Sequence, residues 1–144
     1  MGQPSFLRAL VRDPQGAFLL RNTRTGAAVV TFVEPAFDSQ TRNRGLLGRT
    51  GLPSDRAVAI APCGAVHTWF MKFPIDVMFV NRDGTVRRIV HAVRPYRLAV
   101  SVMSHCVIET AAGVIAASGT RVGDALRLEP AIAGSSADLR QVAG

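Results

Sequence analysis

The stretch CGAVHTWFMKFPIDVMFV, residues 63–80, decides the fold of this 144-residue chain. It holds the only tryptophan and the only lysine of the sequence, and it is apolar on both sides of Pro74. Because proline cannot donate a backbone hydrogen bond to a β-ladder, the stretch divides into two predicted strands, at 66–71 and 75–80. The centre of the chain is therefore predicted to be β-structure.

A turn signal follows the second of these strands directly. Residues 81–84 read Asn-Arg-Asp-Gly, and residues 85–93 are rich in β-branched side chains. Asn, Asp and Gly tolerate the backbone conformations that tight hairpins require. Residues 75–93 are therefore predicted to form an antiparallel hairpin.

Short apolar runs alternate with turn residues along the rest of the chain, as in β-sandwiches and barrels. The pattern predicts a hairpin from 17–21 and 27–33, a short helix at about 39–47, strands at 57–61, 106–110 and 125–128, a loop at 94–97 and a short helix or turn at 111–118. The predicted fold class is mainly β (α+β), a single antiparallel β-rich sandwich-like or barrel-like domain with one or two short helices. This domain is expected to span residues 1–130, with 131–144 as a flexible C-terminal tail.

The composition is that of a globular protein, with 48% hydrophobic and 19% charged residues. No apolar run reaches the roughly 18 to 20 residues that a membrane-spanning helix needs. Asp13 and Pro14 interrupt the N-terminus before a signal-peptide core could form. Two cysteines are too few for a disulfide framework. The chain is therefore expected to be soluble and cytoplasmic, and its oligomeric state is left open.

The net charge of +7 would suit an anionic partner. Apart from Lys72 every basic residue is arginine, and the arginines are scattered, with Arg87-Arg88 and the pair Arg94 and Arg97 among the nearest approaches to clusters. Phosphate binding needs several cations on one face, and base recognition needs a recognisable module. Nucleic-acid binding through arginines is therefore the third of three functional hypotheses.

Asp76 is a carboxylate inside an apolar run, and it needs a partner because an unpaired buried charge costs several kcal/mol. Lys72 is the nearest candidate in sequence, and Arg44 and His67 are further candidates. One interpretation is structural, with Asp76 capping a turn or pairing with Lys72 to fix the bend. The functional interpretation places Lys72 and Asp76 at the mouth of a pocket with Met71 and Trp69 as its floor.

The residues also carry a resemblance to a known family. The three blocks that carry it are RGLLGR at 44–49 with Leu52, HTWFMKFPIDVMF at 67–79, and VIE at 107–109 with Ala112-Gly113, Gly119 and Val122-Gly123-Asp124. In order and spacing they resemble the domain of unknown function 192 family, small bacterial and archaeal proteins, often exported, with no established activity. The resemblance implies a single β-rich, sandwich-like domain. Many members carry an Asn-Thr insertion between Met-Lys and the proline, which is absent here, and place Trp directly before Met, where this chain has Phe70.

Glu109 repeats the problem of Asp76, because it lies in the apolar strand 106–110. It could accept hydrogen bonds from Arg44 or Lys72. One interpretation is a partly buried ion pair that ties a strand to the helix carrying Arg44. The other is that Arg44, Lys72, Asp76 and Glu109 converge on one cleft and bind a small polar or anionic ligand.

Cys63, His67, His105 and Cys106 offer the atom types that zinc prefers. Adjacent residues of a strand point to opposite faces, so 105 and 106 could not both ligate without a bend, and no metal or other cofactor is predicted. A disulfide between Cys63 and Cys106 is left open, because spacing alone cannot establish its geometry. An enzyme that uses Cys63 and His67, with or without zinc, is the second functional hypothesis.

The first hypothesis is a non-catalytic domain that binds a small polar or anionic ligand, or a protein partner, in a groove around Met71, Lys72 and Asp76. No catalytic residue is predicted. The predicted ligand-binding residues are Arg44, His67, Trp69, Met71, Lys72, Asp76 and Glu109.

Overall fold

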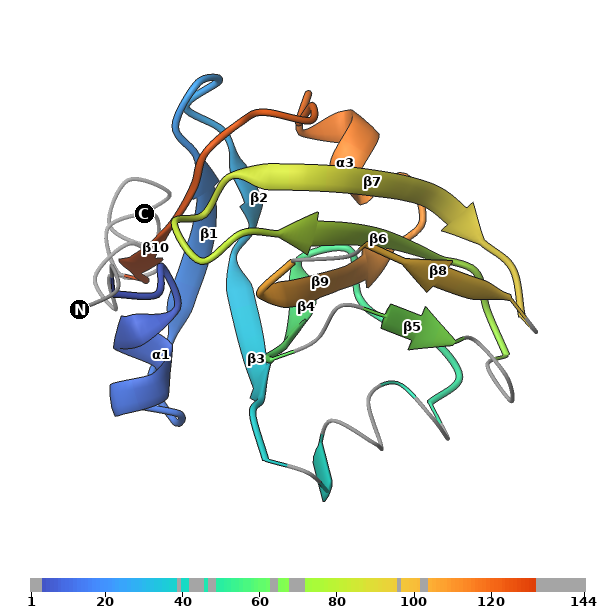
Figure 1. The fold of residues 1–144 in the computed structure, drawn as a ribbon, viewed down its shortest axis with the longest axis horizontal. Helices are drawn as coiled ribbons and strands as arrows, with labels where there is room; N and C mark the ends of the chain where they lie inside the picture. Colours follow the sequence, from blue (N-terminus) through green and yellow to red (C-terminus); the bar gives the residue numbers. More distant parts are fainter. Residues whose placement is uncertain are drawn as a thin grey trace, which may run out of the picture.

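The computed structural model describes residues 4–38, 40–41, 46, 49–62, 65–67, 72–95, 97–101 and 104–131. Its helices are α1 (Arg8–Arg12) and α3 (Val114–Ala117), and its strands are β1 (Phe18–Asn22), β2 (Ala28–Val30), β3 (Phe32–Ala36), β4 (Arg56–Ile60), β5 (Ala65–His67), β6 (Ile75–Val80), β7 (Val86–Val93), β8 (Leu98–Val100), β9 (Cys106–Ala111) and β10 (Leu126–Pro130). The predicted β-rich domain with short helices is confirmed (Figure 1).

The strands form a three-stranded sheet in the order β10-β1-β2, a five-stranded sheet in the order β3-β4-β9-β6-β7, and a two-stranded sheet of β5 and β8. In Figure 1, α1 and β10 lie at the left of the molecule, whereas β5 and β8 lie at its right. The five-stranded sheet is central, and both of its faces are covered by apolar side chains. This explains why β6 is buried along its whole length.

Both predicted hairpins are confirmed. β1 pairs with β2, and β6 pairs with β7, in antiparallel register. In the β6–β7 turn the Gly84 N–H donates to the carbonyl of Asn81 at 3.0 Å, and Gly84 has a φ of +94°. A Cβ at this position would lie 2.4 Å from the carbonyl oxygen of Leu126, so the turn requires glycine both for its backbone conformation and for its close approach to β10.

The predicted strand 27–33 is in fact two strands that belong to different sheets. β2 ends at Val30 and β3 begins at Phe32, and the N–H groups of Thr31 and Phe32 both donate to the carbonyl of Asp55. β3 then pairs with β4 in parallel, which is the one parallel pair among the described strands. Periodicity cannot reveal this change of sheet, because an apolar run looks the same whether one or two partners bury it.

Two apolar clusters cover the two faces of the central sheet. On one face, Met78, Val80 and Ile108 pack with residues of α1, α3 and the three-stranded sheet, and this is called the α1 face. On the other face, Val77, Phe79, Val107 and their neighbours pack with Leu46, Leu52 and Ala99 of β8, and this is called the β8 face. Alternate residues of β6 and β9 therefore belong to different layers of the core.

The helix α1 was not predicted. It is only five residues long and makes no side-chain cap hydrogen bond, so the signals that mark a helix in sequence are missing. It forms because Leu7 and Leu10 are buried against the α1 face. Tertiary packing rather than local propensity therefore decides this element.

The remaining predicted elements are found near their expected positions, as β4, β9, α3 and β10. The predicted loop 94–97 is followed by β8, a short strand that was not predicted. The predicted helix 39–47 and the predicted tail 131–144 lie largely outside the described residues. None of the helices in the described part of the chain has the length and apolar character that a membrane crossing requires.

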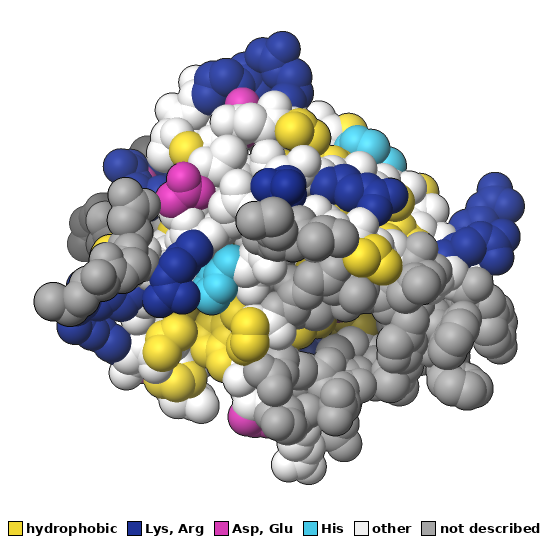
Figure 2. All heavy atoms as spheres, viewed as in Figure 1, with side chains coloured by type: hydrophobic (Ala, Val, Ile, Leu, Met, Phe, Trp, Pro, Cys, Tyr) yellow, Lys and Arg dark blue, Asp and Glu magenta, His cyan; other side chains and the backbone are white. Residues whose placement is uncertain are grey.

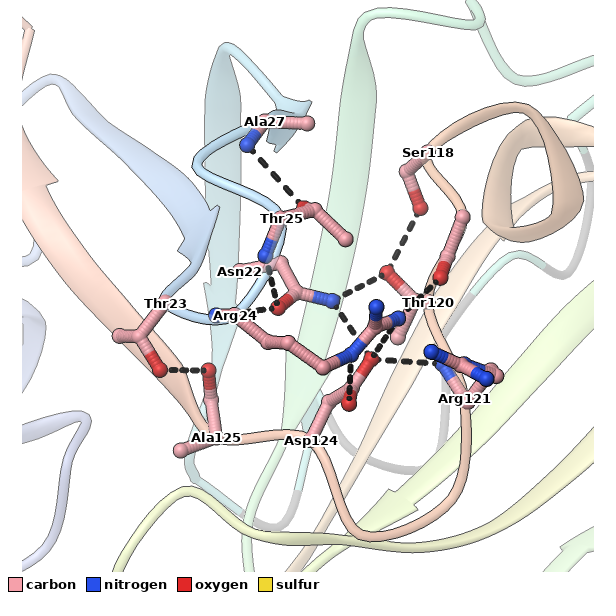
Figure 3. A network of polar contacts seen from close by, with 11 residues as sticks. Asn22, Thr23, Arg24, Thr25, Ala27, Ser118, Thr120, Arg121, Asp124 and Ala125 are labelled. Atoms are coloured by element: carbon pink, nitrogen blue, oxygen red, sulfur yellow. Dashed lines mark hydrogen bonds and ion pairs between the residues drawn. The ribbon is translucent and has the colours of Figure 1, made fainter.

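A buried polar cluster fastens the first hairpin to the segment before β10 (Figure 3). Asp124 accepts hydrogen bonds from Asn22 Nδ2 at 2.9 Å, from Arg24 Nε at 2.6 Å and from the Arg121 N–H at 2.8 Å, and Asn22 Nδ2 also donates to Thr120 Oγ1. The hydrogen bonds from Arg24 in particular hold the pKa of Asp124 far below its usual range. Because these partners satisfy both carboxylate oxygens, the cluster serves the fold.

Candidate functional site

Three of the seven predicted site residues have described side chains: Lys72, Asp76 and Glu109. The backbone of His67 lies in β5, but its side chain is outside the described part of the structure, as are Arg44, Trp69 and Met71. The site is therefore built from the first three residues and from the side chains around them.

Asp76 is fully buried and is satisfied by the backbone. Its Oδ1 accepts the N–H of Ala92 at 2.8 Å, and its Oδ2 accepts the N–H groups of Gly113 at 2.9 Å and Ile115 at 3.4 Å. His91 Nδ1 lies 3.9 Å from Oδ2. The side chain therefore joins β6 to β7 and to the turn that leads into α3, as the structural interpretation of Asp76 anticipated.

The bond from Ala92 explains the shape of β7. Ile75 pairs with Val93 and Val77 pairs with Val90, so His91 and Ala92 together oppose the single residue Asp76. This is a β-bulge, and Ala92 has a φ of +48° within it. The Asp76 carboxylate thus holds an otherwise unfavourable backbone conformation, and the extra residue keeps Val93 on the same face as Val90.

Glu109 is also buried, but its environment is different. Burial raises the pKa of Glu109 to about 7, and the charge of Arg49 opposes this rise only in part. Its Oε2 has no hydrogen-bond partner within the described residues. Arg49 is itself engaged, because its Nη2 donates to Glu34 Oε2 at 2.7 Å. Glu109 is therefore a carboxyl poised to change its protonation state near neutral pH.

The predicted convergence of Asp76 and Glu109 on one cleft is wrong. In the β6–β9 register Asp76 lies opposite Thr110, whereas Glu109 lies opposite Val77. Cross-strand partners share a face, so Asp76 points to the α1 face and Glu109 to the β8 face. A five-stranded sheet separates the two carboxyls.

Of the predicted cation partners only Lys72 has a described side chain, because Arg44 and the side chain of His67 lie outside the described residues. Lys72 is exposed, and the described part of the chain shows no ion pair between Lys72 and Asp76. Within the same part, the cation that acts on Glu109 is Arg49. The sequence did not indicate Arg49 as a partner of Glu109. Only the pairing of β3 with β4 and of β4 with β9 shows that Glu34, which binds Arg49, lies on the same face as Glu109.

A basic cavity lies beside the bulge, and we call it the β7–β8 cavity. Its volume is about 420 Å³, and its walls are Arg88, Val90, Ala92, Val93, Arg94, Arg97 and Ala99. Three of these seven residues are arginines, and no acidic side chain lines the cavity among the described residues. The volume lies within the range of small-molecule sites.

Arg88 is fixed at the wall of this cavity. Its guanidinium lies 5.9 Å from the centre of the Phe79 ring, and its Nη1 donates to the carbonyl of Val100. These contacts join β7 to β8 and hold a positive charge over the apolar floor. The arginine clusters at 87–88 and 94–97 were the available signal for this site, but the sequence does not show that β7 and β8, which belong to different sheets, lie on two sides of one cavity.

Of the four residues considered as zinc ligands, Cys63 and the side chain of His67 lie outside the described part of the structure, so this set is not tested; among the described residues no three His, Cys, Asp or Glu side chains gather. His105 Nε2 lies 3.1 Å from Ser5 Oγ, whereas Cys106 is buried in the core on the α1 face. The two neighbours therefore have different surroundings, as strand geometry requires. Cys63 lies outside the described residues, so the question of its pairing with Cys106 stays open.

Comparison with known proteins places this geometry in a family. A solved structure from Novosphingobium aromaticivorans DSM 12444, a protein of unknown function, matches with a TM-score of 0.68 and 24% identity over 77% of this chain and 83% of that one. A second, a "putative transcription regulator" from Sinorhizobium meliloti 1021, matches with a TM-score of 0.69 and 25% identity over 78% of this chain and 92% of that one. The first similarity shows the fold alone.

No curated protein matches the chain. The model of the DUF192 family, described as "Uncharacterized ACR", matches residues 20–128. This range includes all three sequence blocks, both strands that carry Asp76 and Glu109, and the whole β7–β8 cavity. The chain therefore belongs to the DUF192 family.

Proposed function

We propose that this domain binds a small, multiply charged anion, without catalysis, in the β7–β8 cavity. The observation that carries the proposal is the set of three arginines, Arg88, Arg94 and Arg97, around a floor of Val90, Val93 and Ala99. Guanidinium groups match the geometry of carboxylate and phosphate oxygens, and an apolar floor strengthens their attraction to an anion. The excess of basic residues over the whole chain adds a favourable long-range field.

The proposed ligand site therefore moves from the predicted groove around Met71, Lys72 and Asp76 to the neighbouring β7–β8 cavity, whose described lining residues include none of these three. Lys72 lies three residues before Ile75, and Ile75 pairs with Val93 of the cavity wall. Asp76 holds the bulge that places Val93 there. We therefore assign Asp76 to positioning the wall rather than to contacting the ligand, and Lys72 to the basic rim.

The test compares anions of different charge with a pair of arginine variants. Citrate, with three carboxylates, is expected to bind at least tenfold more tightly than acetate in isothermal titration calorimetry, because only a multiply charged anion can engage several guanidinium groups. The double variant Arg94→Gln/Arg97→Gln is expected to weaken citrate binding at least tenfold.

The matched control is Arg87→Gln/Arg121→Gln, which removes the same charge from two exposed arginines outside the cavity. It is expected to change the citrate affinity less than about threefold, through the long-range field alone. Equal losses in the two double variants, or the absence of saturable citrate binding, would count against the site.

The similar protein from Sinorhizobium meliloti is described as a "putative transcription regulator", so nucleic-acid binding is a second candidate function. A phosphate backbone would also be attracted to arginines on one face. The two functions differ in their response to salt. When a protein neutralises several phosphates of duplex DNA, its affinity for the DNA falls steeply as the salt concentration rises. If DNA binds with such a slope and Arg94→Gln/Arg97→Gln abolishes it while citrate does not bind, the cavity belongs to a nucleic-acid surface instead.

A further inference from the structure

A second cavity lies beside α1, on the opposite side of the central sheet from Glu109, and we call it the α1 cavity. Its volume is about 480 Å³, and its walls are Pro4, Ser5, Leu7, Arg8, Val11, Arg12, Phe37, Ala61, Pro62, Arg82 and His105. In Figure 2, hydrophobic side chains form a patch beside histidine and basic side chains on the left half of the visible face. The α1 cavity shares no residue with the β7–β8 cavity.

The charges of this cavity are all positive among the residues described. Arg8 and Arg12 stand four residues apart on α1, so their side chains are neighbours on one helix face. Like charges at this spacing repel each other and destabilise a helix. Arg82 adds a third guanidinium from the β6–β7 turn. An anion held between these groups would replace their repulsion with attraction.

The rest of the wall is apolar, and part of it is open to solvent. Leu7, Phe37, Ala61 and Pro62 form the surface next to the arginines. Val11 also lines the cavity and is 55% exposed, although a branched aliphatic side chain is usually buried. The cavity therefore offers a charged end and an apolar side to one ligand.

Ser5 and His105 supply neutral hydrogen-bonding groups. Ser5 Oγ accepts the N–H of Leu7 at 3.2 Å and lies 3.1 Å from His105 Nε2. Burial, and then the charge of Arg82, lower the pKa of His105, so its ring is neutral at pH 7. No carboxylate among the described lining residues orients the histidine, so the pair lacks the third member of a nucleophilic site and serves recognition.

We infer that the α1 cavity binds a carboxylate with an unbranched apolar body, such as a medium-chain fatty acid. Arg8 and Arg12 hold the carboxylate, because guanidinium groups pair with it through two parallel hydrogen bonds. Val11, Phe37 and Pro62 cover the hydrocarbon body, whose removal from water stabilises the complex in proportion to the apolar area that is buried. This ligand class differs from the compact polyanion of the β7–β8 cavity.

The experiment separates the charge from the apolar body. Octanoate is titrated into ¹⁵N-labelled protein, with octanol and acetate as single-feature probes, and binding is followed from the amide shifts of α1 and His105. Octanoate is expected to bind at least tenfold more tightly than either probe. Arg8→Gln/Arg12→Gln is expected to weaken the binding of octanoate at least tenfold. Val11→Ser is expected to weaken the binding of octanoate but not that of acetate.

The control Arg87→Gln/Arg121→Gln removes equal charge elsewhere and is expected to leave octanoate affinity within about threefold of the parent. Octanol binding as tightly as octanoate would overturn the inference, as would equal losses in the two double variants. Citrate titrations of Arg8→Gln/Arg12→Gln, and octanoate titrations of Arg94→Gln/Arg97→Gln, keep the two cavities distinguishable. Each of these crossed titrations is expected to match the parent protein within threefold.

Discussion

Replacing Asp76 with alanine is expected to lower the free energy of unfolding by about 3–5 kcal/mol. The carboxylate is fully buried and accepts the N–H groups of Ala92, Gly113 and Ile115. A buried donor left without an acceptor costs about 1–3 kcal/mol, which applies in full to Ile115, whereas Ala92 and Gly113 are exposed residues whose N–H groups are part-buried. The bulge at Ala92 would also lose the contact that compensates its positive φ, so the loss is expected to exceed that of an ordinary core substitution.

Urea denaturation measures this loss, and Lys72→Ala is the control. Lys72 is exposed, so its replacement is expected to change the free energy of unfolding by less than about 0.5 kcal/mol. Asp76→Asn keeps the shape of the side chain and one acceptor oxygen, so its free energy of unfolding is expected to lie between those of the parent protein and of Asp76→Ala. A loss below about 1 kcal/mol for Asp76→Ala would show that water or a backbone shift satisfies the three donors.

Replacing Glu109 with glutamine is expected to change the free energy of unfolding in favour of the folded state by about 3 kcal/mol more at pH 8 than at pH 4.5. Burial raises the pKa of Glu109 to about 7, compared with an ordinary value of 4.5. The folded state therefore holds a proton that the unfolded state has lost between these two pH values. Stability from this proton is fully present below pH 4.5 and disappears as pH rises through 7, where the buried carboxyl must ionise.

The measurement is the difference in unfolding free energy between Glu109→Gln and the parent across pH 4.5–8. Taking the difference is necessary because His105, whose pKa is lowered on folding, contributes a slope of opposite sign to the pH dependence of stability. Gln15→Ala, a change at an exposed residue that carries no titrating group, is the control and is expected to give a flat difference over this range. A flat difference for Glu109→Gln would mean that its Oε2 is satisfied in solution.

The burial of the two central carboxyls was predicted, whereas their part in a ligand site stays a prediction. The apolar surroundings of Asp76 and Glu109 correctly indicated that both carboxyls are buried, and the turn-capping interpretation of Asp76 matches its bonds to backbone donors. The choice of partners was not predictable in the same way. A charged side chain can act on any other charge that the fold brings near it. Arg49 binds Glu34 of β3, and Glu34, Val58 and Glu109 lie opposite one another across β3, β4 and β9, so the charge of Arg49 acts on Glu109.

Neither cavity was predicted from the sequence, because each is formed by segments that only the fold brings together. The α1 cavity joins residues from the first helix, from the connections after β3 and β4, from the β6–β7 turn and from the residue before β9. No local pattern links such distant segments, because each of them alone reads as an ordinary surface. The arginine pairs before and after the β7 bulge were visible in the sequence, but the bulge that gives them a common cavity was not.

By itself the sequence determined the strand-rich class, the hairpins at β1–β2 and β6–β7, and the burial of β6, because alternation and turn chemistry are local properties of the chain. Only the tertiary structure decided which face each residue of β6 and β9 occupies, since that depends on register between strands that are about 30 residues apart. A shift of one residue in this register would exchange the faces of Asp76 and Glu109. The pairing of strands, and not the composition of either strand, therefore separates the structural carboxylate from the titrating one.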